Sequence, residues 1–192
     1  LRVLPAAANT GIVFRRTDVS THECIIPAHQ DMVELSPLCT KLKNKRDVTI
    51  STVEHIMAAL AGCHVDNALI EVDGPEIPIL DGSSLPFVRE IRASGIKQLN
   101  SLSKVLRILK PLRVSRGDSW AEILPGQGFS MEATIDFQDA AIGRQSFRYD
   151  AESHSFDTEL AASRTFCRIQ DLAEMRRAEK ALGGSFDNAI VI

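Results

Sequence analysis

The stretch Ser51-Thr52-Val53-Glu54-His55-Ile56-Met57-Ala58-Ala59-Leu60-Ala61-Gly62 decides how the first half of this chain folds. At about 100° per residue, its apolar side chains gather on one side of a helix. His55 falls on nearly the opposite side, among the small residues Thr52, Ala58 and Ala59, so another segment or a ligand can approach it closely. The pattern predicts an amphipathic helix that Gly62 ends and an outward-facing imidazole. The apolar stripe consists of Val53, Ile56, Met57, Leu60 and Ala61.

The Glu54–His55 pair has ordinary interpretations as well as a functional one. Ser51 and Glu54 have the spacing of a capping box, in which the two side chains satisfy free backbone donors at the start of a helix. An outward histidine is more often a solvated surface residue than a metal ligand. From these residues alone, Glu54 and His55 can be either structural surface residues or part of a functional site.

Composition limits the class of protein. The chain has 192 residues, of which 44% are hydrophobic, and we expect two small domains, each with its own core. A net charge of −3 and 5% aromatic residues disfavour nucleic-acid binding. No apolar run approaches the roughly 18 residues of a membrane span, so we expect no stable membrane insertion and no secretory leader.

The four cysteines, Cys24, Cys39, Cys63 and Cys167, are scattered and include no C-x-x-C pair. They are therefore interpreted as reduced thiols in a cytosol-like compartment rather than as a disulfide framework or a structural zinc site.

Strand and helix signals divide the chain into two halves on either side of residues 93–101. In the first half we predict strands at 11–16 and 68–72, an extended segment at 77–80, and a helix over 85–93 that Gly95 ends. In the second half we predict strands at 112–114, 120–124 and 129–137, which together form a half-buried antiparallel sheet. Helices at 156–162 and 169–182 and a closing strand at 189–192 follow. The whole pattern predicts an α+β fold.

Several longer blocks resemble the UDP-3-O-acyl-N-acetylglucosamine deacetylase family, and they occur in the family's order and spacing. The resemblance extends over essentially the whole chain, including residues 8–18 and 38–40. The blocks are Ser51-Thr52-Val53-Glu54-His55, Asp66-Asn67-Ala68, Gly74-Pro75-Glu76-Ile77-Pro78-Ile79-Leu80-Asp81-Gly82-Ser83-Ser84, Arg164-Thr165-Phe166 and Gly183-Gly184-Ser185-Phe186-Asp187-Asn188-Ala189.

The resemblance implies a zinc amidohydrolase that removes the acetyl group from UDP-3-O-(hydroxyacyl)-N-acetylglucosamine, a committed step of lipid A synthesis. It makes Glu54 the general base that takes a proton from zinc-bound water, and His55 a ligand of the Zn²⁺ cofactor. Thr165 matches the threonine that donates a hydrogen bond to the tetrahedral oxyanion. Without the resemblance, Thr165 would be an ordinary turn or strand residue.

The fold implied by the resemblance is a two-domain sandwich in which each domain is a sheet with helices on one face and the helix layers pack together. The domains are expected at 1–97 and 103–192, with the active site at their junction and a β-α-β insert at about 166–189. The insert's interior is expected to be a passage for the substrate's acyl chain; the alternative is ordinary packing of an apolar stripe. The residues expected to line the passage are Ile169, Leu172, Leu182 and Phe186.

The sequence also departs from the family pattern. In the family, the other two zinc ligands, a histidine and an aspartate four residues apart, and a further histidine follow the Gly-Gly-Ser block and are not found among these residues. The family's opening glycine-rich strand with its Leu-His pair is also absent, so we interpret the chain as truncated at both ends. Neither His64 with Asp66 nor His154 with Asp157 has the required spacing, and His22 and His29 match no ligand position.

Two other functions remain open. One is a non-catalytic paralogue that binds the nucleotide sugar or the acyl chain, and the other is an RNA-binding or ribosomal-type α+β protein. The resemblance further implies a monomer with a small UDP-sugar lipid substrate, in the cytoplasm of a Gram-negative bacterium or in an organelle that kept the pathway.

Overall fold

The computed structural model describes residues 1–20, 22–169, 185 and 187–192. It has two compact units: Leu1–Ser101 together with Phe156–Ile192, and Leu102–Ser155. Strands occur in both units and the described helices lie in the first, which confirms the α+β class. The expected domain at 103–192 is divided between the units, and the two-domain sandwich with packed helix layers remains a prediction.

A four-stranded mixed sheet forms the base of the first unit, with the strand order β1-β7-β2-β3. β7 pairs antiparallel with β1 and parallel with β2, and β3 is antiparallel to β2. Along β7, Ala68, Ile70 and Val72 are buried because alternate residues of a strand face the same side. The strands expected at 11–16 and 68–72 are confirmed. The bounds are β1 Arg2–Pro5, β2 Ile12–Arg16, β3 Ile25–Pro27 and β7 Ala68–Val72.

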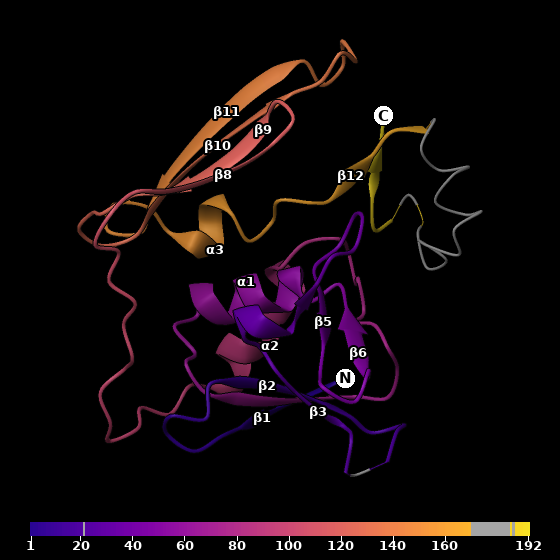
Figure 1. Cartoon of the computed structure of the whole chain (residues 1–192), viewed down its shortest axis with the longest axis vertical. Helices are drawn as coiled ribbons and strands as arrows, with labels where there is room; N and C mark the ends of the chain where they lie inside the picture. The colour runs from indigo at the N-terminus through magenta and orange to yellow at the C-terminus, as the bar shows by residue number, and fades with distance from the viewer. Residues whose placement is uncertain (21, 170–184, 186) are drawn as a thin grey trace. The chain divides into compact units, whose positions relative to one another are not determined.

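Two helices, α1 (Glu54–Gly62) and α2 (Leu85–Ser94), lie on one side of this sheet (Figure 1). Gly95, with φ 79°, ends α2 in the left-handed region, as the sequence predicts. No described helix is long and apolar enough to cross a membrane. The core between the helices and the sheet includes Phe14, Ile26, Ile70, Ile56, Leu60 and Val88.

A small antiparallel sheet precedes α1 along the chain. It contains β4 (Val33–Glu34), β5 (Lys41–Lys43) and β6 (Thr49–Ser51), and a short 3-10 helix, η1 (Gln30–Met32), comes before it. Buried Leu42 and Ile50 face each other across β5 and β6 and join the core of the unit. The last strand of this sheet, β6, ends at Ser51, and α1 begins three residues later at Glu54.

The second unit consists of two antiparallel hairpins, β8 (Leu112–Arg116) with β9 (Ser119–Ile123) and β10 (Ser130–Asp136) with β11 (Arg144–Asp150). The strands expected at 112–114, 120–124 and 129–137 are confirmed, whereas β11 was not predicted. The expectation of one half-buried sheet is wrong: the hairpins are separate sheets, and β8, β9 and β10 are exposed throughout. Residues 102–155 contain no helix that could cover a face of these hairpins.

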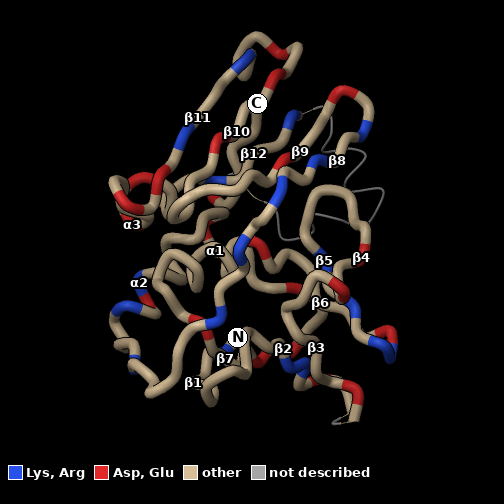
Figure 2. The backbone as a smooth tube through the Cα atoms, turned by 60° about the vertical axis from the view of Figure 1, so that its left-hand side comes forward, with Lys and Arg blue, Asp and Glu red and all other residues tan. Residues whose placement is uncertain are grey.

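The chain returns to the first unit through α3 (Phe156–Glu159), which is shorter than the helix expected at 156–162. β12 (Phe166–Cys167) and β13 (Ile190–Val191) pair in parallel, so the strand expected at 189–192 is confirmed. The helix expected at 169–182 lies almost entirely outside the described residues. Figure 2 shows that basic and acidic residues are interspersed along the described chain.

Candidate active site

The start of α1 is held by a loop that follows β7. The N–H of Ser51, the last residue of β6, donates to the carbonyl oxygen of Pro75 at 2.9 Å, and the N–H of Ile77 donates to the carbonyl oxygen of Ser51 at 3.0 Å. Thr52 then turns the chain with φ 59°, and the helix begins at Glu54. The pair Glu54–His55 therefore occupies the first turn of α1.

The capping-box interpretation, one of the two left open by the sequence, is wrong. The N-cap residue is Val53, which makes no side-chain capping bond, and Ser51 lies two residues too early because it still belongs to β6. Glu54 instead accepts a hydrogen bond at Oε2 from the backbone N–H of Thr40, at 3.0 Å. Glu54 is half-buried, so its carboxylate is fixed on one side and reachable by solvent.

His55 lies at the edge of the buried face of α1 rather than opposite to it. The buried set includes Ala59 and leaves out Ala61, which is exposed, so the face is rotated toward His55 relative to the expected stripe. His55 is half-buried and lies outside the core, as expected. No described residue forms a hydrogen bond or ion pair with its imidazole.

Thr165 lies next to a tight turn at Asp81-Gly82. Its N–H donates to the carbonyl oxygen of Gly82 at 2.8 Å, and its carbonyl oxygen accepts from the N–H of Ile190 at 3.1 Å. Gly82 has φ 82°, and a Cβ there would lie 2.0 Å from the carbonyl oxygen of Asn188. Glycine is therefore required for the close approach of the segments that hold Thr165.

The segment 75–82 connects the two parts of the candidate site. Its beginning bonds to Ser51 and Thr52 before α1, and its end bonds to Arg164 and Thr165. Among the described residues no hydrogen bond joins Thr165 directly to Glu54 or His55. The structure thus places Glu54 beside His55 and links Thr165 to them through this segment.

Arg164 is a structural contributor that sequence reasoning did not single out. Its Nε donates to the carbonyl oxygen of Asp81 at 2.8 Å, and its Nη2 donates to the carbonyl oxygen of Asp187 at 2.5 Å. The guanidinium of the residue before Thr165 therefore links the Asp81-Gly82 turn to the chain at Asp187. The sequence signal that could have identified Arg164 is its position directly before Thr165 in a block shared with the family. That position does not reveal that its guanidinium bonds to backbone carbonyl oxygens far along the chain.

No group of three His, Cys, Asp or Glu side chains among the described residues is arranged to hold a metal ion. His29 and His154 each accept a backbone N–H at Nδ1, at 3.3 Å and 3.2 Å. One ring nitrogen of each of these two histidines is therefore occupied. None of the four cysteines forms a disulfide in the part of the chain that the structure describes.

Only one of the four residues expected to line the acyl passage is among the described residues. Ile169 is 69% exposed, so it presents apolar surface, whereas Leu172, Leu182 and Phe186 lie outside the described residues. The passage remains a prediction.

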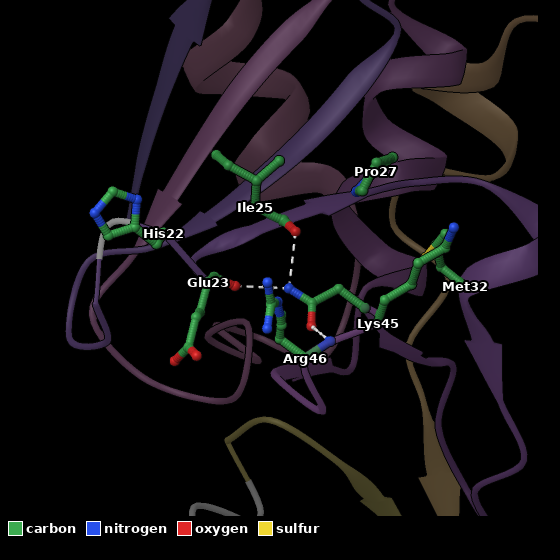
Figure 3. Close-up of a pocket in the computed structure, with 8 residues that line it drawn as sticks. His22, Glu23, Ile25, Pro27, Met32, Lys45 and Arg46 are labelled. Carbon is green, nitrogen blue, oxygen red and sulfur yellow. Dashed lines mark hydrogen bonds between the residues drawn. The ribbon is translucent and has the colours of Figure 1, made fainter.

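A shallow hollow of about 290 Å³ lies elsewhere in the first unit, and Figure 3 shows the residues around it. The Asn44 side chain spans one wall, because its Nδ2 donates to the carbonyl oxygens of Glu23 and Ile25. None of the predicted site residues lines it. The lining residues are His22, Glu23, Ile25, Pro27, Met32, Asn44, Lys45 and Arg46.

Comparison with known proteins gives extensive similarity. The chain is 47% identical over 194 aligned positions to a UDP-3-O-acyl-N-acetylglucosamine deacetylase of Idiomarina loihiensis, covering 100% of the chain and 63% of that protein. It is 48% identical over 190 positions to the protein of the same name from Photobacterium profundum, covering 98% of the chain and 62% of that protein. The chain therefore spans less than two thirds of the length of these relatives. The family described as UDP-3-O-acyl N-acetylglycosamine deacetylase matches residues 1–192, and the chain belongs to that family.

Proposed function

We propose that the natural protein carrying this sequence removes the acetyl group from UDP-3-O-(hydroxyacyl)-N-acetylglucosamine in lipid A synthesis, with Zn²⁺ as its cofactor. The observation that carries the proposal is the family match over residues 1–192, in which Glu54 and His55 stand together and accessible on the first turn of α1. The relatives from Idiomarina loihiensis and Photobacterium profundum are named UDP-3-O-acyl-N-acetylglucosamine deacetylases, which supports a UDP-sugar lipid as the substrate class.

The described residues do not make a complete zinc centre. Catalytic zinc sites use three protein ligands and one open position, and His55, whose imidazole bonds to no described residue, offers one such ligand. We propose His55 as one ligand of a site whose other ligands are not among the described residues. A zinc ion there would supply a Lewis acid that acidifies water and polarises the acetyl carbonyl.

Glu54 is the proposed general base. In amide hydrolysis a water oxygen bonds to the acetyl carbon, the water loses a proton to the base, and the C–N bond then breaks as the amine nitrogen takes up a proton. The Glu54 carboxylate has one oxygen, Oε2, bonded to the Thr40 N–H, which leaves Oε1 for this proton. Because the hydrogen bond fixes one oxygen of the carboxylate, the other oxygen has a defined direction. This orientation favours proton transfer compared with a freely rotating carboxylate.

Thr165 is the proposed donor to the oxyanion that forms on the acetyl carbonyl. Its backbone N–H and carbonyl groups bond to Gly82 and Ile190, so the position from which its half-buried side chain extends is fixed. Hydrogen-bond donors that are fixed before the reaction stabilise developing charge without reorganising. Ile169 is the described member of the proposed acyl passage and offers exposed apolar surface to the substrate's lipid chain.

Acetate release by the natural protein tests the proposal. The protein is incubated with the UDP-sugar lipid before and after removal of metal by a chelator, and again after zinc is restored. We expect turnover, its loss on chelation and its recovery with zinc. Binding of the substrate without acetate release in the presence of zinc would contradict the proposal and favour a non-catalytic binding protein.

A further inference from the structure

Thr52 adopts a backbone conformation that its residue type disfavours. Its φ is 59°, in the left-handed region, and its side chain is 7% exposed. A β-branched residue is a genuine outlier there, whereas glycine and asparagine enter this region at lower cost. Such conformations persist where the surroundings over-determine them, and they concentrate at functional sites.

The Thr52 hydroxyl has a specific partner. Its Oγ1 donates to Oε1 of Glu76 at 2.6 Å, and Glu76 also forms a parallel β-bridge with Ser51. Glu76 lies in the loop after β7 and is an exposed residue, whereas Thr52 is buried, and a buried hydroxyl needs such a partner. The contact joins the residue that turns the chain to the segment 75–82 that runs on to Thr165.

The turn at Thr52 sets the direction in which α1 begins. Ser51 is still a strand residue and Glu54 is already helical, so the chain changes direction within Thr52 and Val53. Val53 makes no side-chain cap and its N–H reaches the carbonyl oxygen of Thr40 at 3.4 Å, a long hydrogen bond. Two side-chain hydrogen bonds, Thr52 to Glu76 and the Thr40 N–H to Glu54, therefore flank the first turn, in addition to the backbone bonds of Ser51 with Pro75 and Ile77.

We propose that Thr52, through its hydrogen bond to Glu76, is a positioning residue that fixes the first turn of α1 and thereby the directions of the Glu54 carboxylate and the His55 imidazole. The step that it positions rests on the function proposed above. A small displacement of a catalytic group costs rate rather than binding, so the effect is expected in kcat and not in KM.

The test compares Thr52→Val, which removes the hydroxyl, with Thr52→Ser, which keeps it, and with Glu76→Ala, which removes the acceptor. Thr17→Val is the matched control, because the Thr17 hydroxyl donates to the carbonyl oxygen of Val72 at 3.3 Å, in the same unit. Each variant is made in the natural protein carrying this sequence. The measurements are kcat and KM for acetate release, thermal unfolding, and amide hydrogen exchange of Val53 and Met57.

We expect Thr52→Val and Glu76→Ala to lower kcat by about tenfold to a hundredfold with KM nearly unchanged. Thr52→Ser and Thr17→Val should retain kcat. Amide exchange at Val53 and Met57 should be faster in the first two variants and unchanged in the control, because the first turn opens locally without global unfolding. A glycine variant, Thr52→Gly, should unfold at the same or higher temperature and still lose kcat, since it relieves the backbone strain and deletes the hydroxyl.

The inference is overturned if Thr52→Val and Glu76→Ala retain kcat while Glu54→Gln abolishes it. It is also overturned if Thr52→Ser loses kcat as fully as Thr52→Val does. If the unmodified protein releases no acetate, the proposed function fails instead. Hydrogen exchange then decides the positioning role: equal rates at Val53 in Thr52→Val and Thr17→Val overturn it, and faster rates only in Thr52→Val support it.

Discussion

The backbone N–H of Thr40 donates a hydrogen bond to Oε2 of Glu54 at 3.0 Å, across the gap between the loop before β5 and the first turn of α1. The bond joins residues 14 positions apart in the sequence. It gives Glu54 an orientation that a solvated surface carboxylate would lack. A substitution at Glu54 that keeps the shape of the side chain but removes its acid–base chemistry therefore tests the proposed function.

Glu54→Gln should separate chemistry from folding. The amide oxygen of glutamine can still accept from Thr40, so the free energy of unfolding should change by less than about 0.5 kcal/mol. The amide cannot take a proton, so kcat/KM should fall by about 10²-fold to 10⁴-fold. Acetate release and urea unfolding on the same preparation check both. Retained turnover would remove Glu54 from the role of base.

Gly82→Ala should destabilise the first unit. The new Cβ would lie 2.0 Å from the Asn188 carbonyl oxygen, and alanine would have to adopt φ 82°. We expect a loss of about 1–3 kcal/mol in the free energy of unfolding, measured with urea. Gly74→Ala is the control, because a Cβ at Gly74 meets nothing within 4 Å. Equal stability of the two variants would show that the Gly82–Asn188 approach is not retained in solution.

The Glu34 carboxylate should titrate unusually low. Hydrogen bonds from Lys41 and Lys43, at 2.6 Å and 2.7 Å, lower the pKa of Glu34 to about 2 from 4.5. Since the folded pKa lies below the unfolded one, the pair's contribution to stability is complete above about pH 4.5 and is lost as the pH falls toward 2.

NMR titration of the Glu34 side-chain carbon measures this pKa directly. A Lys41→Met, Lys43→Met double variant should move it back toward 4.5, and about 1 M salt should move it part of the way, because the carboxylate is solvent-accessible and screened. A midpoint of 4.5 in the unmodified protein would contradict the ion-pair geometry.

Cys63 should react slowly with alkylating agents. Burial raises the pKa of the Cys63 thiol, and Asp157 raises it further while Arg92 opposes the shift. Less thiolate is therefore present at mildly alkaline pH, and the side chain is 2% exposed. Cys39 and Cys167, which are both half-buried, should be modified before Cys63 in peptide mapping after iodoacetamide treatment of the folded protein. Modification of Cys63 at the same rate would indicate that α1 opens readily at its C-terminal end.

Local patterns predicted β2, β7, α1 and α2 of the first unit, whereas β1, β3 and the sheet of β4, β5 and β6 were not predicted. The alternation in residues 68–72 and Gly95 after α2 are signals that tertiary contacts reinforce, so these elements could be predicted without the structure. Gly62, in contrast, is the last residue of α1, and the left-handed residue beyond the helix is His64. The phase of α1 was predicted less well. Counting Ala61 rather than Ala59 as buried placed His55 opposite the core, whereas it lies at the edge, because small alanines contribute little to an apolar stripe and are easily assigned to the wrong face.

The contacts that hold the candidate site could not be predicted. Thr40, Glu76 and Arg164 act through backbone atoms or side chains far along the chain, and no local pattern encodes such pairings. The positive φ at Thr52 also runs against the preference of a β-branched residue, so propensity predicts the opposite conformation. In the second unit, alternation predicted strands correctly, but burial depends on what covers a sheet, which the pattern does not specify.

The most direct test of the account is the rate of acetate release by His55→Gln beside His64→Gln in the natural protein supplied with zinc. His64 is an exposed histidine just beyond the end of α1, so its replacement controls for the loss of an imidazole. The account predicts that His55→Gln loses turnover and that His64→Gln keeps it. Equal turnover in the two variants would contradict the assignment of His55 to a catalytic zinc site.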